Sequence, residues 1–161
     1  MPIWMKAGWV FFCLAVFWIL EGYYALVVKK YKKWKHAKVN LLLLVLVMII
    51  NAVFGILTVG IFVWLDANQF GILHLFDLPV WAELLLAIIV LDLIAQYGVH
   101  YLLHQVPSLW RLHIVHHSDK HVDATTGTRH HPLDFILRES FALLTVIIMG
   151  MPISFYFFYR I

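Results

Sequence analysis

Four apolar runs constrain what this chain can fold into. A helix that spans the hydrocarbon of a bilayer needs about 20 mostly apolar residues. Such runs cover 7–28, 41–65, 79–104 and 140–159. Hydrophobic residues make up 63% of the 161 residues and charged residues only 13%, whereas a soluble domain has about 25% charged residues. The runs predict an all-α integral membrane protein, a single domain over 1–161 with about four transmembrane helices, the last kinked at Pro152.

Basic residues gather on one side of the predicted helices. Six lysines fall within 29–38 and four arginines and lysines within 105–138, whereas only Lys6 and Arg160 fall on the other side. Cytoplasmic loops carry the excess of lysine and arginine in membrane proteins. Both loops are therefore predicted to be cytoplasmic, with both termini outside. A lysine run between two transmembrane helices is expected to contact anionic lipid rather than nucleic acid.

Histidines are concentrated in one short stretch of the sequence. Eight of the ten lie between residues 100 and 131, within "HYLLHQVPSLWRLHIVHHSDKHVDATTGTRHH". His36 and His74 lie outside the stretch, and each is interpreted as a polar residue at the membrane interface. Clustered imidazoles predict a metal site, with ligands at His100, His104, His113, His116 and His117, and further candidates at His131, His121 and His130.

The spacing of the histidines predicts how they meet. His100 and His104 are four residues apart and share one face of a helix, a face that Asp92 and Gln96 extend by the same step. These two polar residues could orient imidazole N–H groups or pair with other helices. A second, interfacial helix is predicted from about Ser108, turning its histidines back toward the first pair.

The type and number of the candidate ligands limit which metals the site could bind. Imidazole ligands suit zinc, copper, iron or nickel, but a zinc site closes at about four ligands, and the HExxH motif of zinc proteases is absent. A two-metal site fits the number of histidines better. A metal transporter would need ligands inside the transmembrane helices, where only Glu21, Asp92 and Gln96 are candidates.

The ordered motifs resemble a known family. HxxxH, then WxxHxxHHSD, then DATTxxRxHP, all between Asp92 and Asp134, are similar to the fatty acid hydroxylase and sterol desaturase superfamily, in its bacterial membrane form. The resemblance implies a cytoplasmic di-iron centre in a multi-pass protein of the bacterial inner membrane. It implies an oxidoreductase that uses O2, and electrons from an external reductase or ferredoxin, to hydroxylate or desaturate a fatty acyl or sterol-like lipid.

Residue roles carry over from the family by motif position. His100 and His104 fill the first histidine box, and the second is filled by His113, His116 and His117. The resemblance implies supporting positions beside the ligands at Asp92, Asp119, Asp123 and Arg129, with His131 at a family position as well, and the helix spacing adds Gln96 to the supporting residues.

Two departures from the family pattern stand out. Asp134 occupies a position where the family commonly has glutamate, and no third histidine box precedes Ile161. The expectation is therefore that the domain is incomplete at its C-terminal end, and that the 161-residue form has little activity. The alternative is a short, non-catalytic metal-binding membrane protein without the third box.

Overall fold

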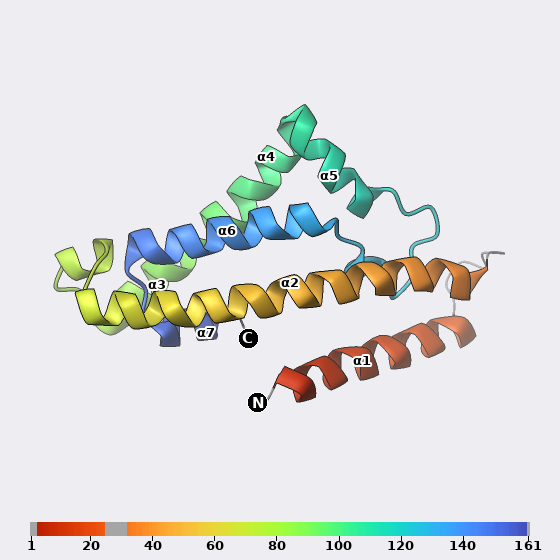
Figure 1. Cartoon of the computed structure of the whole chain (residues 1–161), viewed down its shortest axis with the longest axis horizontal. Helices are drawn as coiled ribbons and strands as arrows, with labels where there is room; N and C mark the ends of the chain where they lie inside the picture. The colour runs from red at the N-terminus through yellow and green to blue at the C-terminus, as the bar shows by residue number, and fades with distance from the viewer. Residues whose placement is uncertain (1–2, 25–31, 161) are drawn as a thin grey trace.

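The chain folds into helices joined by turns and loops (Figure 1). The structure is a computed structural model that describes residues 3–24 and 32–160. No strand occurs among these residues, so the prediction of an all-α fold is confirmed. The α-helices are α1 (Ile3–Tyr23), α2 (Lys33–Asn68), α3 (Val80–Leu91), α4 (Val99–Gln105), α5 (Pro107–His117), α6 (Pro132–Met149) and α7 (Ile153–Arg160). A π-helical segment, η2 (Asp92–Gly98), joins α3 to α4, and two short 3-10 turns are η1 (Ile72–Leu75) and η3 (Thr126–Thr128).

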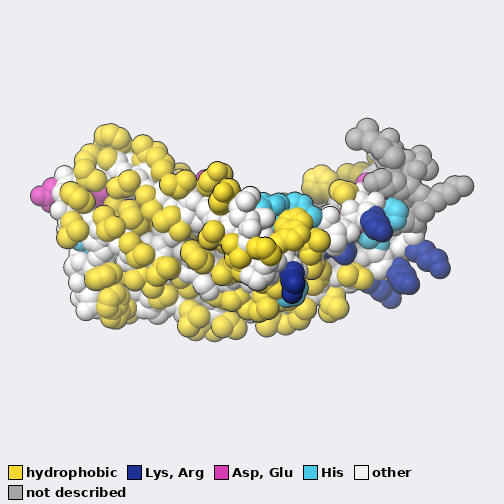
Figure 2. All heavy atoms as spheres, turned by 90° about the horizontal axis from the view of Figure 1, so that it is seen from above, with side chains coloured by type: hydrophobic (Ala, Val, Ile, Leu, Met, Phe, Trp, Pro, Cys, Tyr) yellow, Lys and Arg dark blue, Asp and Glu magenta, His cyan; other side chains and the backbone are white. Residues whose placement is uncertain are grey.

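Two helices are long and apolar enough to cross a membrane. They are Lys33–Leu75 and Val80–Gln105, and they overlap the second and third predicted runs. The number of about four transmembrane helices and the orientation of the loops stay predictions. The apolar part of α1, Gly8–Tyr23, is shorter, and residues 25–28 of the predicted first helix lie outside the described residues. Hydrophobic side chains cover most of the face in Figure 2. An outer surface this apolar suits lipid contact and would be unusual in a soluble protein.

The core lies where α2, α3, α6 and α7 meet. Phe62 and Leu65 of α2 pack with Leu91, Val146 and Phe155 in one buried cluster. Helices α2 and α6 lie side by side along much of their length (Figure 1). Because helices in lipid associate through close packing rather than through exclusion of water, this cluster is what holds the bundle together.

One narrow face of the 80–105 helix is buried from Ala87 to Leu103. Its residues recur every four positions and are at most 2% exposed: Ala87, Leu91, Ala95, Val99 and Leu103. The next residue along at each step belongs to a polar series, Asp92, Gln96, His100 and His104, whose members are exposed or half-buried. Packing of the apolar face therefore fixes the direction in which the polar face points. The π-helical segment lies within this stretch, and such segments are frequent at functional sites.

The fourth predicted helix differs from the structure. A single helix over 140–159 with a kink at Pro152 is wrong, because α6 begins earlier, at Pro132, and ends at Met149, and α7 is a separate helix. Gly150 adopts a left-handed conformation with φ 67° and ends α6. The chain then turns back, so that α7 lies against α3 (Figure 1). Left-handed glycine followed closely by proline is a common way to end a helix.

The turn after α6 is in direct contact with the connection that follows α2. Gly71 has φ 125°, and a Cβ atom on it would lie 2.2 Å from the backbone nitrogen of Gly150. Likewise, a Cβ atom on Gly150 would lie 2.2 Å from the carbonyl oxygen of Phe70. Both positions therefore require glycine, for space as well as for backbone conformation.

The first prediction concerns this contact. Gly150→Ala should destabilise the protein, because the methyl group would collide with backbone and the residue would have to keep a positive φ. Gly55→Ala is the matched control: it lies inside α2 with nothing within 4 Å, and alanine favours a helix by about 0.5–1 kcal/mol over glycine. Thermal unfolding in detergent should show a lower midpoint for Gly150→Ala than for the wild-type protein, and no decrease for Gly55→Ala. Equal midpoints would contradict the steric account.

Candidate metal centre

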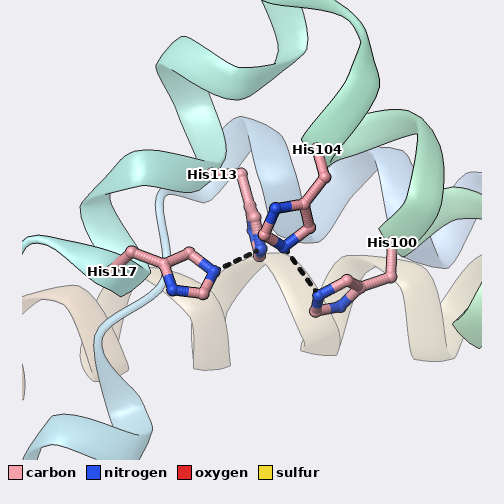
Figure 3. A group of neighbouring side chains, drawn as sticks. All are labelled: His100, His104, His113 and His117. Carbon is pink, nitrogen blue, oxygen red and sulfur yellow. Dashed lines mark hydrogen bonds between the residues drawn. The ribbon is translucent and has the colours of Figure 1, made fainter.

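Four histidine side chains converge between α4 and α5. One nitrogen from each of His100, His104, His113 and His117 lies within 4.8 Å of the nitrogens of the other three (Figure 3). Two come from α4 and two from α5, and the helices meet at a sharp turn. Pro107 is the first residue of α5, and Val106 before it is extended, at φ −92° and ψ 116°. Proline disfavours helical conformation in the residue before it and fits well at a helix start, so the sequence dictates this turn.

The helix predicted from about Ser108 is confirmed as α5, which begins at Pro107, and its interfacial position stays a prediction. It turns His113 and His117 toward α4, as predicted. The Nε2 atoms of His100 and His104 are 3.0 Å apart, and those of His113 and His117 are 3.1 Å apart. His113 is fully buried, whereas His104 and His117 are exposed. The cluster therefore has a buried side and a side open to a ligand.

A buried carboxylate supports the cluster from α6. Asp134 is 0% exposed, and its Oδ2 accepts a hydrogen bond from His113 Nδ1 at 2.9 Å. Its Oδ1 accepts from Arg138 Nε at 2.8 Å, and Arg138 Nη2 donates to His100 Nδ1 at 3.2 Å. One carboxylate and one guanidinium therefore connect α6 to a histidine on each of α4 and α5.

The chemistry of these partners assigns the protons. Burial raises the pKa of Asp134, but hydrogen bonds from His113 and Arg138 outweigh it and leave the pKa below its usual value. The ionised carboxylate can only accept, so His113 carries its proton on Nδ1 and has a lone pair at Nε2. A carboxylate that orients a histidine in this way is the usual support of a metal-binding imidazole.

The remaining box histidine faces a different partner. His116 stacks on His130 with ring centroids 4.7 Å apart and planes 8° from parallel, and its ring centroid is 5.7 Å from that of His113. His116 Nδ1 is buried without a hydrogen-bond partner. Burial, and then the charge of His116, lower the pKa of His130. The two rings form a second imidazole pair beside the four converging histidines.

The other two candidate histidines have different surroundings. His131 precedes α6, and its Nδ1 accepts a hydrogen bond from the backbone N–H of Leu133 at 3.1 Å, so it caps that helix. His121 lies in the loop after α5, with its ring centroid 6.5 Å from that of His36. Neither belongs to the group of four.

The predicted supporting carboxylates in the loop after α5 contact α2. Asp119 lies 2.8 Å from Nε2 of His36, and Asp123 lies 3.0 Å from its Nδ1. Burial raises the pKa of Asp119, but hydrogen bonds from Thr126, the backbone of His121 and His36 lower it to about 2. His36, interpreted from the sequence as an interfacial residue, thus joins the start of α2 to the loop that leads from α5 to α6.

Arg129 strengthens the same junction. Its Nη1 donates to Asn40 Oδ1 and its Nε to the carbonyl oxygen of Val115, each at 3.0 Å. Asn40 is 0% exposed and donates in turn to Thr125 at 2.9 Å. Arg129 therefore positions the segment between the second box and α6 rather than contacting the four histidines.

Asp92 contacts another helix instead of an imidazole. The hydroxyl of Tyr159, on α7, donates to Asp92 Oδ1 at 3.2 Å. For Asp92, this is the second of the two roles that the sequence left open.

Sequence reasoning missed three residues. Arg138 was counted only as a loop charge, Asp134 only as a departure from the family, and His36 was set aside. The spacing of Asp134 and Arg138, four apart at the start of a helix that begins with proline, was the available signal. His36 offered no such signal, because its partners lie 83 and 87 residues away.

A second prediction tests the junction at His36. Asp119→Asn should speed trypsin cleavage after the exposed Lys120, because His36 loses one of its two carboxylate partners. Because the pKa of Asp119 is depressed, its stabilising effect is complete above about pH 4 and is lost only as the pH falls through the folded-state value. The comparison therefore belongs at neutral pH. Asp77→Asn, at an exposed position after η1, should leave the rate unchanged, and identical rates in both variants would refute the assignment.

Comparison with known families identifies the C-terminal part of the chain. Residues 84–161 match the family model described as fatty acid hydroxylase. Comparisons with curated proteins and with solved structures found no match. The matched segment contains all four converging histidines and Asp134. The match confirms the resemblance seen in the histidine motifs, and it assigns the segment 84–161 to the fatty acid hydroxylase family.

Proposed function

We propose that the protein is a membrane-bound, iron-dependent oxygenase that hydroxylates or desaturates a lipid. One observation carries the proposal: four imidazole nitrogens converge at the end of a helix long enough to span a membrane, inside the segment that matches the fatty acid hydroxylase family. The donor set fits the metal, since clustered neutral imidazoles suit iron and other transition metals.

The residues in and around the cluster would have different roles in metal binding. His100, His104, His113 and His117 would hold iron, and His116, with its unpartnered buried nitrogen, would serve the second ion of a di-iron centre. Asp134 holds the His113 ring in the tautomer that presents Nε2. Burial and the neighbouring His113 lower the pKa of His117, which favours its neutral, metal-binding form. Bound iron would supply the redox chemistry with O2 that side chains alone do not offer.

The distribution of charge supports a cytoplasmic site. Lysine and arginine side chains gather toward the end of the molecule that carries the histidines, whereas the largest group of acidic side chains visible in this view lies at the other end (Figure 2). Lys29 and Lys30, which belong to the predicted lysine loop, lie outside the described residues. A site at the inner surface would take its lipid from the bilayer and its electrons from a reductase or ferredoxin in the cytoplasm.

The third prediction tests the metal. The purified full chain should contain iron and support O2-dependent oxidation of membrane lipids when a reductase is supplied. His113→Ala should remove most of the iron, because it deletes the only fully buried member of the group of four. His74→Ala, at an exposed position near the other end of the bundle, should retain it. Equal iron in both variants, measured by elemental analysis, would remove the basis for the proposal.

The fourth prediction tests the supporting carboxylate. Asp134→Asn should weaken metal binding by about 10- to 100-fold, the usual effect of losing a partner that orients a histidine ligand. Titration of the metal-free protein with Fe²⁺ or Co²⁺ under anaerobic conditions measures it. Asp77→Asn is the control of equal charge change. Unaltered affinity in Asp134→Asn would show that the hydrogen bond to His113 has no part in metal binding.

A further inference from the structure

A groove runs from the middle of the 80–105 helix to the histidine cluster. Its volume is about 470 Å³, within the range of about 300–1,000 Å³ that is usual for ligand sites. The lining residues are Asp92, Gln96, Tyr97, His100, Tyr101 and His104. Two of them belong to the group of four converging histidines, so whatever lies in the groove reaches the proposed metal.

The end of the groove away from the histidines is polar, although it lies midway along a candidate transmembrane helix. Asp92 is exposed and lies midway along the candidate transmembrane helix Val80–Gln105. An ionisable side chain at the centre of a bilayer is costly and normally faces a partner or a functional cavity. The helix cannot rotate Asp92 inward, because the neighbouring face, with Leu91 and Ala95 at 1% and 2% exposure, is already packed.

The polar end of the groove has hydrogen-bonding capacity to spare. Tyr159 donates one hydrogen bond to Asp92 Oδ1, whereas a carboxylate can accept about four. Gln96, one helical turn nearer the histidines, adds an exposed amide. A purely hydrocarbon occupant, such as a simple acyl chain, would leave these groups facing methylenes, which is unfavourable. A hydroxyl group would satisfy them.

An aromatic wall lies between the two ends. Tyr97 and Tyr101 stack with ring centroids 6.4 Å apart and planes 18° from parallel, and their side chains are 65% and 53% exposed. The apolar ring faces suit a hydrocarbon body. Eight residues separate Asp92 from His100, which corresponds to a length on the order of 10 Å along the helix.

We propose that this groove is the lipid-binding site and that it selects a lipid bearing a hydroxyl group, which donates to Asp92 beside Gln96. The carbon to be oxidised then lies near His100 and His104, on the order of 10 Å from that hydroxyl. The inference rests on the proposed function for the identity of the site as an oxygenase. It adds the class of lipid: an alcohol whose hydroxyl is remote from the oxidised carbon.

Binding without turnover tests this separately from catalysis. Metal-free full-length protein in phosphatidylcholine nanodiscs is titrated with radiolabelled 1-hexadecanol and with its methyl ether, which keeps the oxygen and loses the donor. The alcohol should bind about tenfold more tightly or better, as expected for a hydrogen bond to a charged group. Asp92→Leu should abolish this preference, whereas Glu83→Leu, nine residues earlier on the same helix, should preserve it.

Further variants test for misfolding and for an alternative occupant of the groove. Gln96→Leu should reduce the preference, and Tyr159→Phe should retain it, because it removes only a competing donor. Equal binding of alcohol and ether by the wild-type protein, or no binding of either, overturns the proposal, whatever the outcome of the iron measurements. Self-cross-linking of Tyr97→Cys in a Cys13→Ser background, together with absent lipid binding, would overturn it in favour of a second copy covering the groove. Loss of preference in Glu83→Leu would also overturn it.

Discussion

The Asp134 carboxylate is the contact on which the arrangement of the candidate centre depends. It is fully buried, binds His113 with one oxygen and Arg138 with the other, and through Arg138 reaches His100. Helices α4, α5 and α6 are thereby joined at one point. A buried charge is stable only when it is paired and hydrogen-bonded, so each helix must be in place for the others to be satisfied. The same contact fixes the proton on His113 Nδ1 and leaves Nε2 available as a ligand.

Polar residues follow one another along a single face of one helix. The apolar face of Val80–Gln105 packs against the core, and the adjacent polar face carries Asp92, Gln96, His100 and His104 in succession. In lipid, polar side chains are retained where they have a task. The group nearest the membrane centre contacts α7 through Tyr159, and the last two meet α5. The packing of the hydrophobic face thus decides the direction in which the polar side chains of this helix point.

A second polar junction keeps the histidine-rich segment folded onto the bundle. His36 and Asn40 at the start of α2 bind Asp119, Asp123, Thr125 and Arg129 of the segment between α5 and α6. Backbone in a loop costs about 1–2 kcal/mol of conformational entropy per residue fixed. Side-chain contacts of this density offset part of that cost. They hold His130 where its ring stacks on His116.

The sequence by itself determined the helical class, the two long candidate transmembrane helices and the turn at Pro107, because hydropathy, periodicity and proline stereochemistry are local properties. It also indicated which histidines share a helix face. Only the tertiary structure decided that His116 pairs with His130, that Asp134 and Arg138 support the cluster, and that α7 folds back at Gly150. The contacts of His116, Asp134 and Arg138 depend on which helix faces meet across 14 to 38 residues of chain. Packing sets such distances, and no local pattern encodes them.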